Sequence, residues 1–199
     1  MSENKNKAEQ TLAAYLRENE RVFWYGKNEP FPLLDKNVKN QILGKWICAA
    51  VVAVGLIAMY LSVAEAAVRE MKIVAGIAAI AAFIMLQPVL ERHKLLRQKY
   101  WLTNQRAIMM KSDGTLHSME LADIDEIQLV KGMDSYDCVA MGCGAIKDLA
   151  KNLRWRACNP KTERETTEEG EEKDNRGIIF YAVSNAEAAM AILEKEKVR

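Results

Sequence analysis

Hydrophobic residues are distributed unevenly, and two long apolar stretches lie in the first half of the chain. Residues 46–63 and residues 73–90 contain no charged side chain. As helices rising ~1.5 Å per residue they would be close in length to the ~30 Å hydrocarbon core of a bilayer. Neither stretch has the polar stripe of a helix packed in a soluble core. A cleaved signal peptide does not fit, because the first stretch begins only at residue 46. The pattern predicts a transmembrane hairpin over residues 46–90.

Basic residues flank this hairpin more densely than they occur in its connector. Residues 64–72 contain two of them, Arg69 and Lys72, whereas the outer flanks contain seven: Lys36, Lys39, Lys45, Arg92, Lys94, Arg97 and Lys99. The positive-inside rule therefore predicts an integral protein of the cytoplasmic (inner) membrane with both termini in the cytoplasm. The spans hold no ionisable residue, which argues against an ion pathway or proton relay. Two spans are too few for a monomeric transporter built from inverted repeats.

Small residues recur at four-residue spacing within the spans, and such faces let helix backbones approach closely. The pairs are Ala49 with Ala53, Ala75 with Ala79, and Ala78 with Ala82. We expect packing within the hairpin to account for them, and a homo-oligomer is the alternative. Pro88 is expected to be a tolerated kink.

The segment before the hairpin, residues 1–45, is expected to be cytoplasmic. Residues 8–20 have apolar positions at helical spacing and predict a helix. Residues 22–25 are β-branched and aromatic and predict a short strand. The apolar cluster at residues 31–34 suits either the lipid headgroups or packing on the cytoplasmic domain, and the sequence leaves both open.

After the second span the apolar pattern changes to period two. Asp113-Gly114 between two such runs is a strong hairpin signal. The final residues, 185–197, read as a helix with Asn185 as its N-cap and Ala188, Ala189, Ile192 and Leu193 as its apolar face. We expect a domain over residues 97–199 with about seven antiparallel strands and a C-terminal helix. The expected strands are residues 100–102, 106–111, 115–121, 124–130, 135–141, 153–157 and 178–183.

An acidic segment interrupts this pattern. Residues 159–176 contain no large apolar side chain. This composition predicts a solvated surface loop that is mobile and does not pack.

Three short motifs resemble those of the bacterial pleckstrin-homology-like (PH-like) membrane proteins. Residues 100–106, YWLTNQR, look like the Tyr-x-Leu-Thr-x-x-Arg entry strand of that family, and residues 121–124, LADI, resemble its Leu-x-Asp-Ile element. Residues 20–30 are similar to its Glu-x-Val-Leu-Trp-x-Gly-x-Pro opening, with two more residues before the proline. The resemblance implies an α+β protein in which a transmembrane hairpin precedes a PH-like antiparallel barrel or sandwich with a C-terminal helix. It implies a fold and no activity, and residues 141–176 depart from it.

Charge and composition exclude several classes of protein. The net charge is +1, without the basic excess of a general nucleic-acid binder. The chain has four cysteines, too few for a disulfide scaffold. No nucleophile elbow, phosphate-binding loop, dinucleotide fingerprint or paired-carboxylate motif is present, so we expect no enzyme and no cofactor.

The cysteines and histidines carry a weaker hypothesis. Cys138, Cys143, Cys158 and His117 together are the residue types of a zinc site, but their spacing is not that of a finger or ribbon. Buried structural cysteines are the favoured interpretation, and the sequence leaves metal binding undecided. His93 lies among the bases that follow the second span and is expected to be solvated.

Four bases form the candidate binding surface: Lys147, Lys151, Arg154 and Arg156. On the expected strand at residues 153–157, both arginines lie on the outer face and Trp155 faces the core. The cluster is either a plain solvated face or a contact for anionic lipid headgroups. The sequence thus favours a membrane-anchored, non-enzymatic binding module whose ligand is a protein, a peptide or a lipid headgroup. The alternative is a structural or assembly factor that acts through its transmembrane helices.

Overall fold

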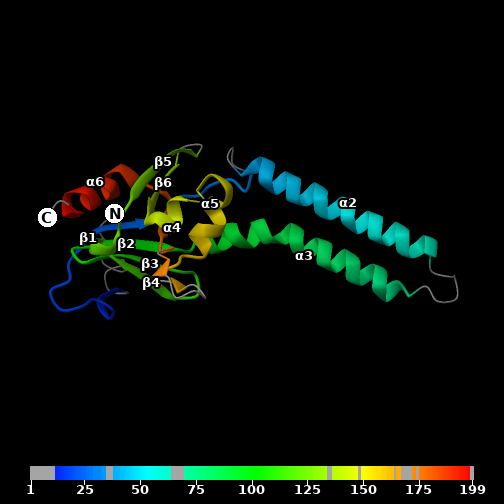
Figure 1. The fold of residues 1–199 in the computed structure, drawn as a ribbon, viewed down its shortest axis with the longest axis horizontal. Coiled ribbons are helices and arrows are strands. Elements are labelled where there is room, and N and C mark those ends of the chain that lie inside the picture. The colour runs from blue at the N-terminus through cyan, green and yellow to red at the C-terminus, as the bar shows by residue number, and fades with distance from the viewer. Residues whose placement is uncertain are drawn as a thin grey trace. The chain divides into compact units, whose positions relative to one another are not determined.

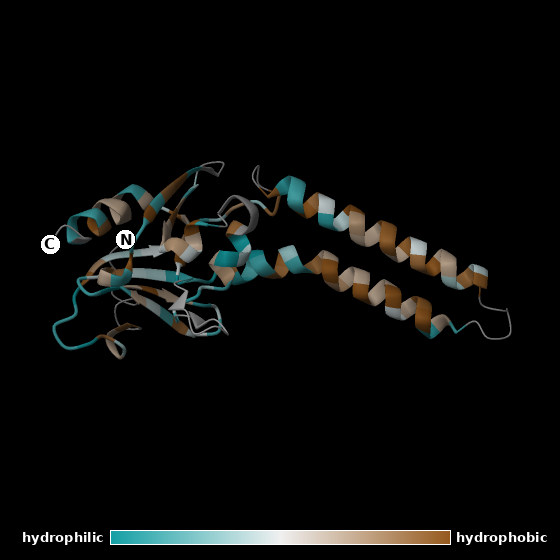
Figure 2. Cartoon of the chain, in the orientation of Figure 1, coloured by the Kyte–Doolittle hydropathy of each residue, from teal (hydrophilic) through white to brown (hydrophobic). Residues whose placement is uncertain are grey.

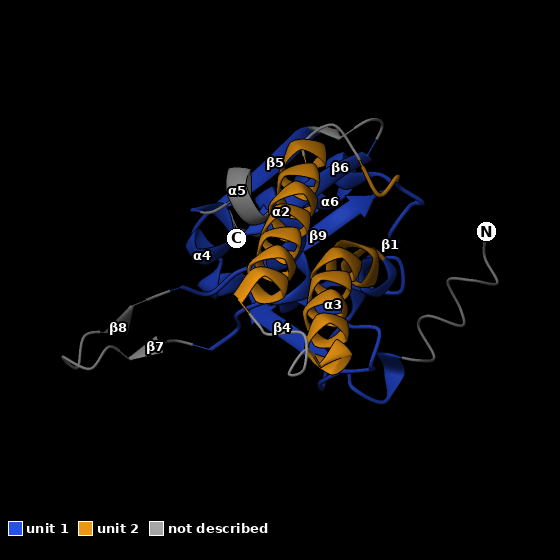
Figure 3. Cartoon of the chain, turned by 90° about the vertical axis from the view of Figure 1, so that its right-hand side faces the viewer, with its two compact units in different colours: residues 1–31, 93–199 blue, residues 32–92 orange. Residues whose placement is uncertain are grey.

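The structure, a computed structural model, describes residues 12–34, 38–63, 70–133, 136–147, 149–163, 165–166, 172–173 and 175–197. The chain divides into two compact units (Figures 1 and 3). Unit 1 comprises residues 1–31 and 93–199, and unit 2 comprises residues 32–92. The class is α+β, as expected from the sequence.

Unit 2 is built from two long helices, α2 (Lys39–Val63) and α3 (Met71–Leu95). The last residues of α3, from His93 onward, belong to unit 1. Both are long and apolar enough to cross a membrane. Each extends beyond its predicted apolar stretch by a polar segment, residues 39–45 in α2 and 91–95 in α3, and Figure 2 shows these ends in teal beside the brown apolar parts. Most of their apolar side chains are exposed, which suits a lipid environment.

The two helices contact each other along one face. The indole N–H of Trp46 donates a hydrogen bond to the carbonyl of Met85 (3.0 Å). Near the other end, the backbone N–H of Glu70 donates to the hydroxyl of Tyr60 (2.8 Å). Pro88 lies within α3, which continues to Leu95, so the helix tolerates the proline as predicted.

Only one of the small-residue pairs fits packing within the hairpin. Ala49 and Ala53 are partly covered, on the same side of α2 as Trp46 and Tyr60. The pairs on α3 are exposed, so the hairpin does not account for them: Ala75, Ala78, Ala79 and Ala82.

Unit 1 contains two main antiparallel sheets. The first has the strand order β1 (Val22–Lys27), β2 (Lys99–Thr103), β3 (Arg106–Met110) and β4 (Leu116–Glu120). The second has the order β5 (Ile127–Met133), β6 (Tyr136–Met141) and β9 (Ile178–Val183). The short strands β7 (Glu165–Thr166) and β8 (Glu172–Lys173) pair only with each other. No sheet closes into a barrel within the residues described.

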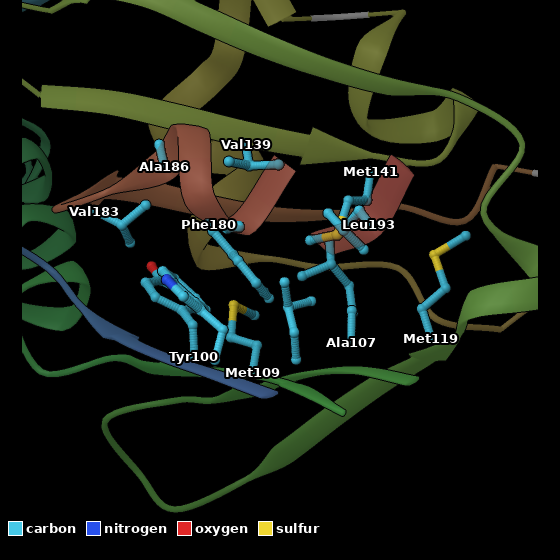
Figure 4. Close-up of a cluster of buried hydrophobic side chains, with 14 of the residues drawn as sticks. Tyr100, Ala107, Met109, Met119, Val139, Met141, Phe180, Val183, Ala186 and Leu193 are labelled. Carbon is cyan, nitrogen blue, oxygen red and sulfur yellow. The ribbon is translucent and has the colours of Figure 1, made fainter. Parts of the chain in front are cut away.

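The core of unit 1 lies between the two sheets. Figure 4 shows Tyr100, Met109 and Met119 from the first sheet facing Met141 and Phe180 from the second. The ring of Phe180 stacks on Tyr100 with 4.7 Å between centroids, and on Trp24 with 5.7 Å. Helix α6 (Ala186–Lys197) adds Ala186, Ala189 and Leu193 to this cluster.

Five of the seven strands expected after the hairpin form close to their predicted positions, and so does the Asp113-Gly114 hairpin turn, with Gly114 at φ 85°. β5 spans Ile127–Met133 instead of the expected residues 124–130, so it begins and ends three residues later than predicted. The remaining expected strand, residues 153–157, was also wrong because those residues are helical. The seventh strand of the two sheets is instead β1, from before the hairpin.

Two helix predictions need correction. The helix expected over residues 8–20 is not continuous: residues 12–13 are helical, residues 14–15 form a turn, and Asn19 has φ 61°. The part before residue 12 lies outside the described residues. On α6, Asn185 directly precedes the helix and its carbonyl accepts the first backbone bonds, but Ala188 is exposed rather than part of the apolar face.

The Glu20 carboxylate holds the segment before β1 against the turn between β2 and β3. Its side chain is fully buried. Arg106 donates to it through Nε (2.9 Å) and through a terminal nitrogen (3.1 Å). The Thr103 hydroxyl and the backbone N–H of Arg17 also donate to it, each at 2.8 Å. Arg106 in addition donates to the carbonyl of Tyr15 (2.8 Å).

This arrangement gives the motif at residues 100–106 a structural role. Burial by itself raises the pKa of Glu20, but the donors from Arg106, Arg17 and Thr103 outweigh burial and hold the pKa below its usual value. The carboxylate therefore stays charged at neutral pH.

Replacing Glu20 by Gln should destabilise unit 1 by about 3 kcal/mol, because Arg106 would keep a largely buried guanidinium without its counter-charge. Thermal unfolding of the full chain in detergent, followed by near-ultraviolet circular dichroism, measures this. The matched control is Arg17→Gln, which removes an equally short ion pair to Glu120 (2.8 Å) between half-exposed side chains. That change should cost much less, because solvent screens an ion pair between exposed side chains. Equal losses in both variants would contradict the role given to Glu20.

Candidate functional site

The candidate bases lie on or beside two short helices, α4 (Cys143–Ile146) and α5 (Leu149–Cys158). The buried side of α5 presents Leu153, Ala157 and Cys158 to a second apolar cluster. That cluster includes Phe31 and Leu95, which stand at the two points where the chain leaves unit 1 for the hairpin and returns from it. The side chain of Gln98 also donates to the carbonyl of Ala157 (3.1 Å). Helix α5 is thus fixed to both connections with the hairpin.

Two glycines let α4 approach the chain that enters β9. The backbone N–H of Gly144 donates to the carbonyl of Arg176 (3.0 Å). A Cβ at Gly144 would collide with the backbone of Asn175, and one at Gly177 would collide with Ala145. This close contact sets the position of α4, and with it the start of α5.

Arg154 is buried, with 4% of its surface exposed, and does not lie on an outer face as predicted. Its Nε donates to the Tyr181 hydroxyl (3.1 Å). Its guanidinium carbon lies 4.9 Å from the centroid of the Phe31 ring, which in turn packs edge-on against Tyr181 at 5.0 Å. The residue acts as a structural connection between α5, β9 and the segment that leads to the hairpin.

A polar network continues from Tyr181 into the core. The Tyr100 hydroxyl donates to the Gln98 side chain (2.8 Å) and accepts from the backbone N–H of Tyr181 (3.2 Å). Asn28 donates to the carbonyl of Tyr181 (2.6 Å). Burial raises the pKa of Tyr100, so this phenol remains neutral and can donate at any physiological pH. The hydrogen bonds of this network join both sheets and α5.

Trp155 also differs from its prediction. It was expected to face the core, but 48% of its surface is exposed. The guanidinium carbon of Arg156, which is partly exposed, lies 5.6 Å from the centroid of the Trp155 ring. Lys147 is exposed just before α5. The side chain of Lys151 lies outside the described residues. The outward side of α5 is therefore aromatic and basic, without Arg154.

The cysteines and histidines are not brought together as a metal site. Among the side chains that the structure describes, no three His, Cys, Asp or Glu residues are grouped so that they could hold a metal ion. Cys138 and Cys158 are buried in the same apolar cluster, and the Cys138 sulfur accepts from the backbone N–H of Ala182 (3.2 Å). His117 lies on β4, where burial and then Lys111 lower its pKa.

Only parts of the acidic segment at residues 159–176 are described, and its prediction as a mobile, unpacked loop lies mostly outside them. Its two ends pack against unit 1. Lys161 and Gly177 exchange two backbone hydrogen bonds (3.2 and 2.7 Å). Arg176 is buried and forms an ion pair with Asp123 (2.8 Å).

Sequence reasoning missed the helical nature of α5 because two patterns overlap there. The alternation from Leu153 to Ala157 suits a strand, but Leu149, Leu153 and Ala157 also follow one another at four-residue spacing. The second pattern predicts a helix with Trp155 on the opposite side from Leu153 and Ala157. This four-residue spacing was the sequence signal that would have identified Trp155 as exposed.

Comparison of the chain with protein-family models, with curated proteins and with solved structures finds no match.

Replacing Arg154 by Gln should lower the free energy of unfolding by about 2–3 kcal/mol, because the change removes a buried charged donor to Tyr181 and its packing on Phe31. The neighbouring change Arg156→Gln is the matched control, and it should cost less than about 0.5 kcal/mol. Both are measured by the thermal unfolding of the full chain in detergent. A harmless Arg154→Gln change would mean that this arginine is solvated after all.

Proposed function

We propose that this chain is an integral membrane protein in which α2 and α3 cross the cytoplasmic membrane and unit 1 acts as a non-enzymatic binding module at its inner face. The ligand of the module is a protein, a peptide or a lipid headgroup. The observation that carries the proposal is the exposure of apolar side chains along both helices, including Ile47, Val54, Ile80 and Phe83. So large an apolar surface is unstable in water and stable in lipid.

We further propose that unit 1 has the PH-like architecture suggested by its motifs. The two antiparallel sheets of unit 1 precede a C-terminal helix, and the resemblance implies such a helix at the end of the domain. The motif residues Glu20, Thr103 and Arg106 support the resemblance, because they belong to one hydrogen-bonded cluster. PH-like folds host protein, peptide and lipid binding alike, so the fold does not select the ligand.

The alternative is a structural or assembly factor that acts through its membrane helices. The observation that favours it is the exposure of the small residues on α3, which leaves Ala75, Ala78, Ala79 and Ala82 uncovered by α2. Such residues occur at helix–helix contacts in membranes. The two functions differ in which unit contacts the partner.

The topology is tested with a membrane-impermeant maleimide on intact cells. A cysteine introduced by Ala67→Cys, in the connector, should be labelled from outside, because the basic flanks keep the termini in the cytoplasm. A cysteine introduced by Thr167→Cys, in the acidic segment, should be labelled only after lysis. The wild-type chain, with its four native cysteines, gives the background. The reverse pattern would overturn the assignment.

Replacing residues 39–92 by an unrelated transmembrane hairpin separates the two functions. If unit 1 binds the ligand, proteins cross-linked to the chain in native membranes and identified by mass spectrometry should be the same for the chimera and the wild type. Loss of every shared partner in a chimera that still inserts would favour the assembly factor. The Glu20→Gln change is a useful third arm, because it weakens unit 1 and leaves the hairpin unaltered.

A further inference from the structure

The exposed tryptophan on α5 is unusual within this molecule. Trp24 and Trp101 are buried in unit 1, and Trp46 lies on α2. Trp155 alone exposes about half of its surface on a helix whose opposite side is packed. Tryptophan is enriched at membrane–water interfaces, where its ring meets the acyl chains and its N–H meets polar groups.

The covalent chain keeps α5 close to the end of the apolar span. Leu95 belongs to the same buried cluster as Leu153 and Ala157 of α5, and it follows Leu90, the last residue of the uncharged stretch, by five residues. Five residues span at most ~18 Å even when fully extended. A membrane crossed by α3 therefore lies within reach of α5, whatever the orientation of unit 1.

Exposed or partly exposed basic residues flank Leu95 and α5 in the sequence. Lys94 and Arg97 are exposed on either side of Leu95, and Lys147 is exposed just before α5. Arg156 lies over the Trp155 ring. Glu91 is the only acid in the stretch from Glu91 to Lys99. Anionic headgroups attract each such base by ~1 kcal/mol near the surface.

We infer that the outward side of α5 is seated in the headgroup layer of the membrane, with Trp155 as its anchor and Lys147, Arg156, Lys94 and Arg97 facing anionic phosphates. This inference rests on the proposed membrane location of the hairpin. It adds a second attachment to the bilayer, which fixes the orientation of unit 1 and leaves its remaining surface for a partner.

Tryptophan quenching by brominated lipid tests the insertion of the hairpin and the docking of α5 separately. The full chain is reconstituted in vesicles of phosphatidylcholine and phosphatidylglycerol, in which part of the phosphatidylcholine carries bromine near the headgroup end of its acyl chains. Wild type is compared with Trp155→Phe, and the difference between their emission spectra isolates Trp155. The variant should fold normally because the ring is exposed, which the melting temperature checks.

The expected result is that the difference emission loses most of its intensity in brominated vesicles and is blue-shifted relative to indole in water. The variant itself should still be quenched through Trp46, which shows that the hairpin is inserted. A difference emission that is insensitive to bromine, with Trp46 quenched, would overturn the inference and leave the proposed function standing. Absence of quenching in both proteins would overturn both.

A charge variant tests the electrostatic part. Arg156→Gln should shift the ratio of docked to undocked α5 about five-fold in phosphatidylglycerol vesicles. The control Lys195→Gln removes the same charge from an exposed position on α6, which packs on the other core cluster, and should change nothing. Equal quenching of Trp155 in wild type, in both variants and in vesicles of phosphatidylcholine alone would contradict a role for the bases.

Discussion

The first sheet of unit 1 depends on one constraint, which is that its edge strand β1 and the neighbouring β2 are separated in sequence by the whole hairpin. Their pairing places Tyr25 opposite Trp101 and Gly26 opposite Tyr100. The Glu20 carboxylate fixes this pairing at one end, since it joins the segment before β1 to Thr103 and Arg106 at the end of β2 and the start of β3. At the other end, Asn28 reaches β9 through the carbonyl of Tyr181. A buried carboxylate with four donors is suited to this task because it tolerates only one arrangement of the surrounding chain.

The features that sequence predicted well are those in which local pattern decides the structure. A helix that spans a bilayer needs about 20 predominantly apolar residues, and residues 46–63 and 73–90 could therefore be identified as helices from the sequence. Hairpin turns are equally local, and Asp113-Gly114 placed β3 and β4. The partner of β1 was not predictable, because pairing across the hairpin leaves no periodic signal. The clustering of Glu20 with Arg106 was not predictable either, although each residue belongs to a recognisable motif.

At the candidate site, the choice between a strand and a helix for residues 153–157 changes which side chains are exposed for binding. As a strand, residues 153–157 would expose Arg154 and bury Trp155; as a helix they do the opposite. The strand hypothesis correctly left Arg156 at least partly exposed, but it assigned Arg154 and Trp155 to the wrong environments. Burial of Arg154 followed from Tyr181 and Phe31, residues that are distant in sequence and appear beside it only in the fold.

The interrupted first sheet also has a consequence for the order of events during synthesis. Chains emerge from the ribosome N-terminus first, so β1 is exposed to solvent before β2 has been translated. Both apolar helices are synthesised in between, so under the proposed function they can enter the membrane before unit 1 assembles. The edge strand therefore stays unpaired until the chain that follows the hairpin has been synthesised. Completion of the first sheet is in this way made dependent on synthesis of the whole hairpin, and a chain that ends before β2 would carry β1 without its partner strand.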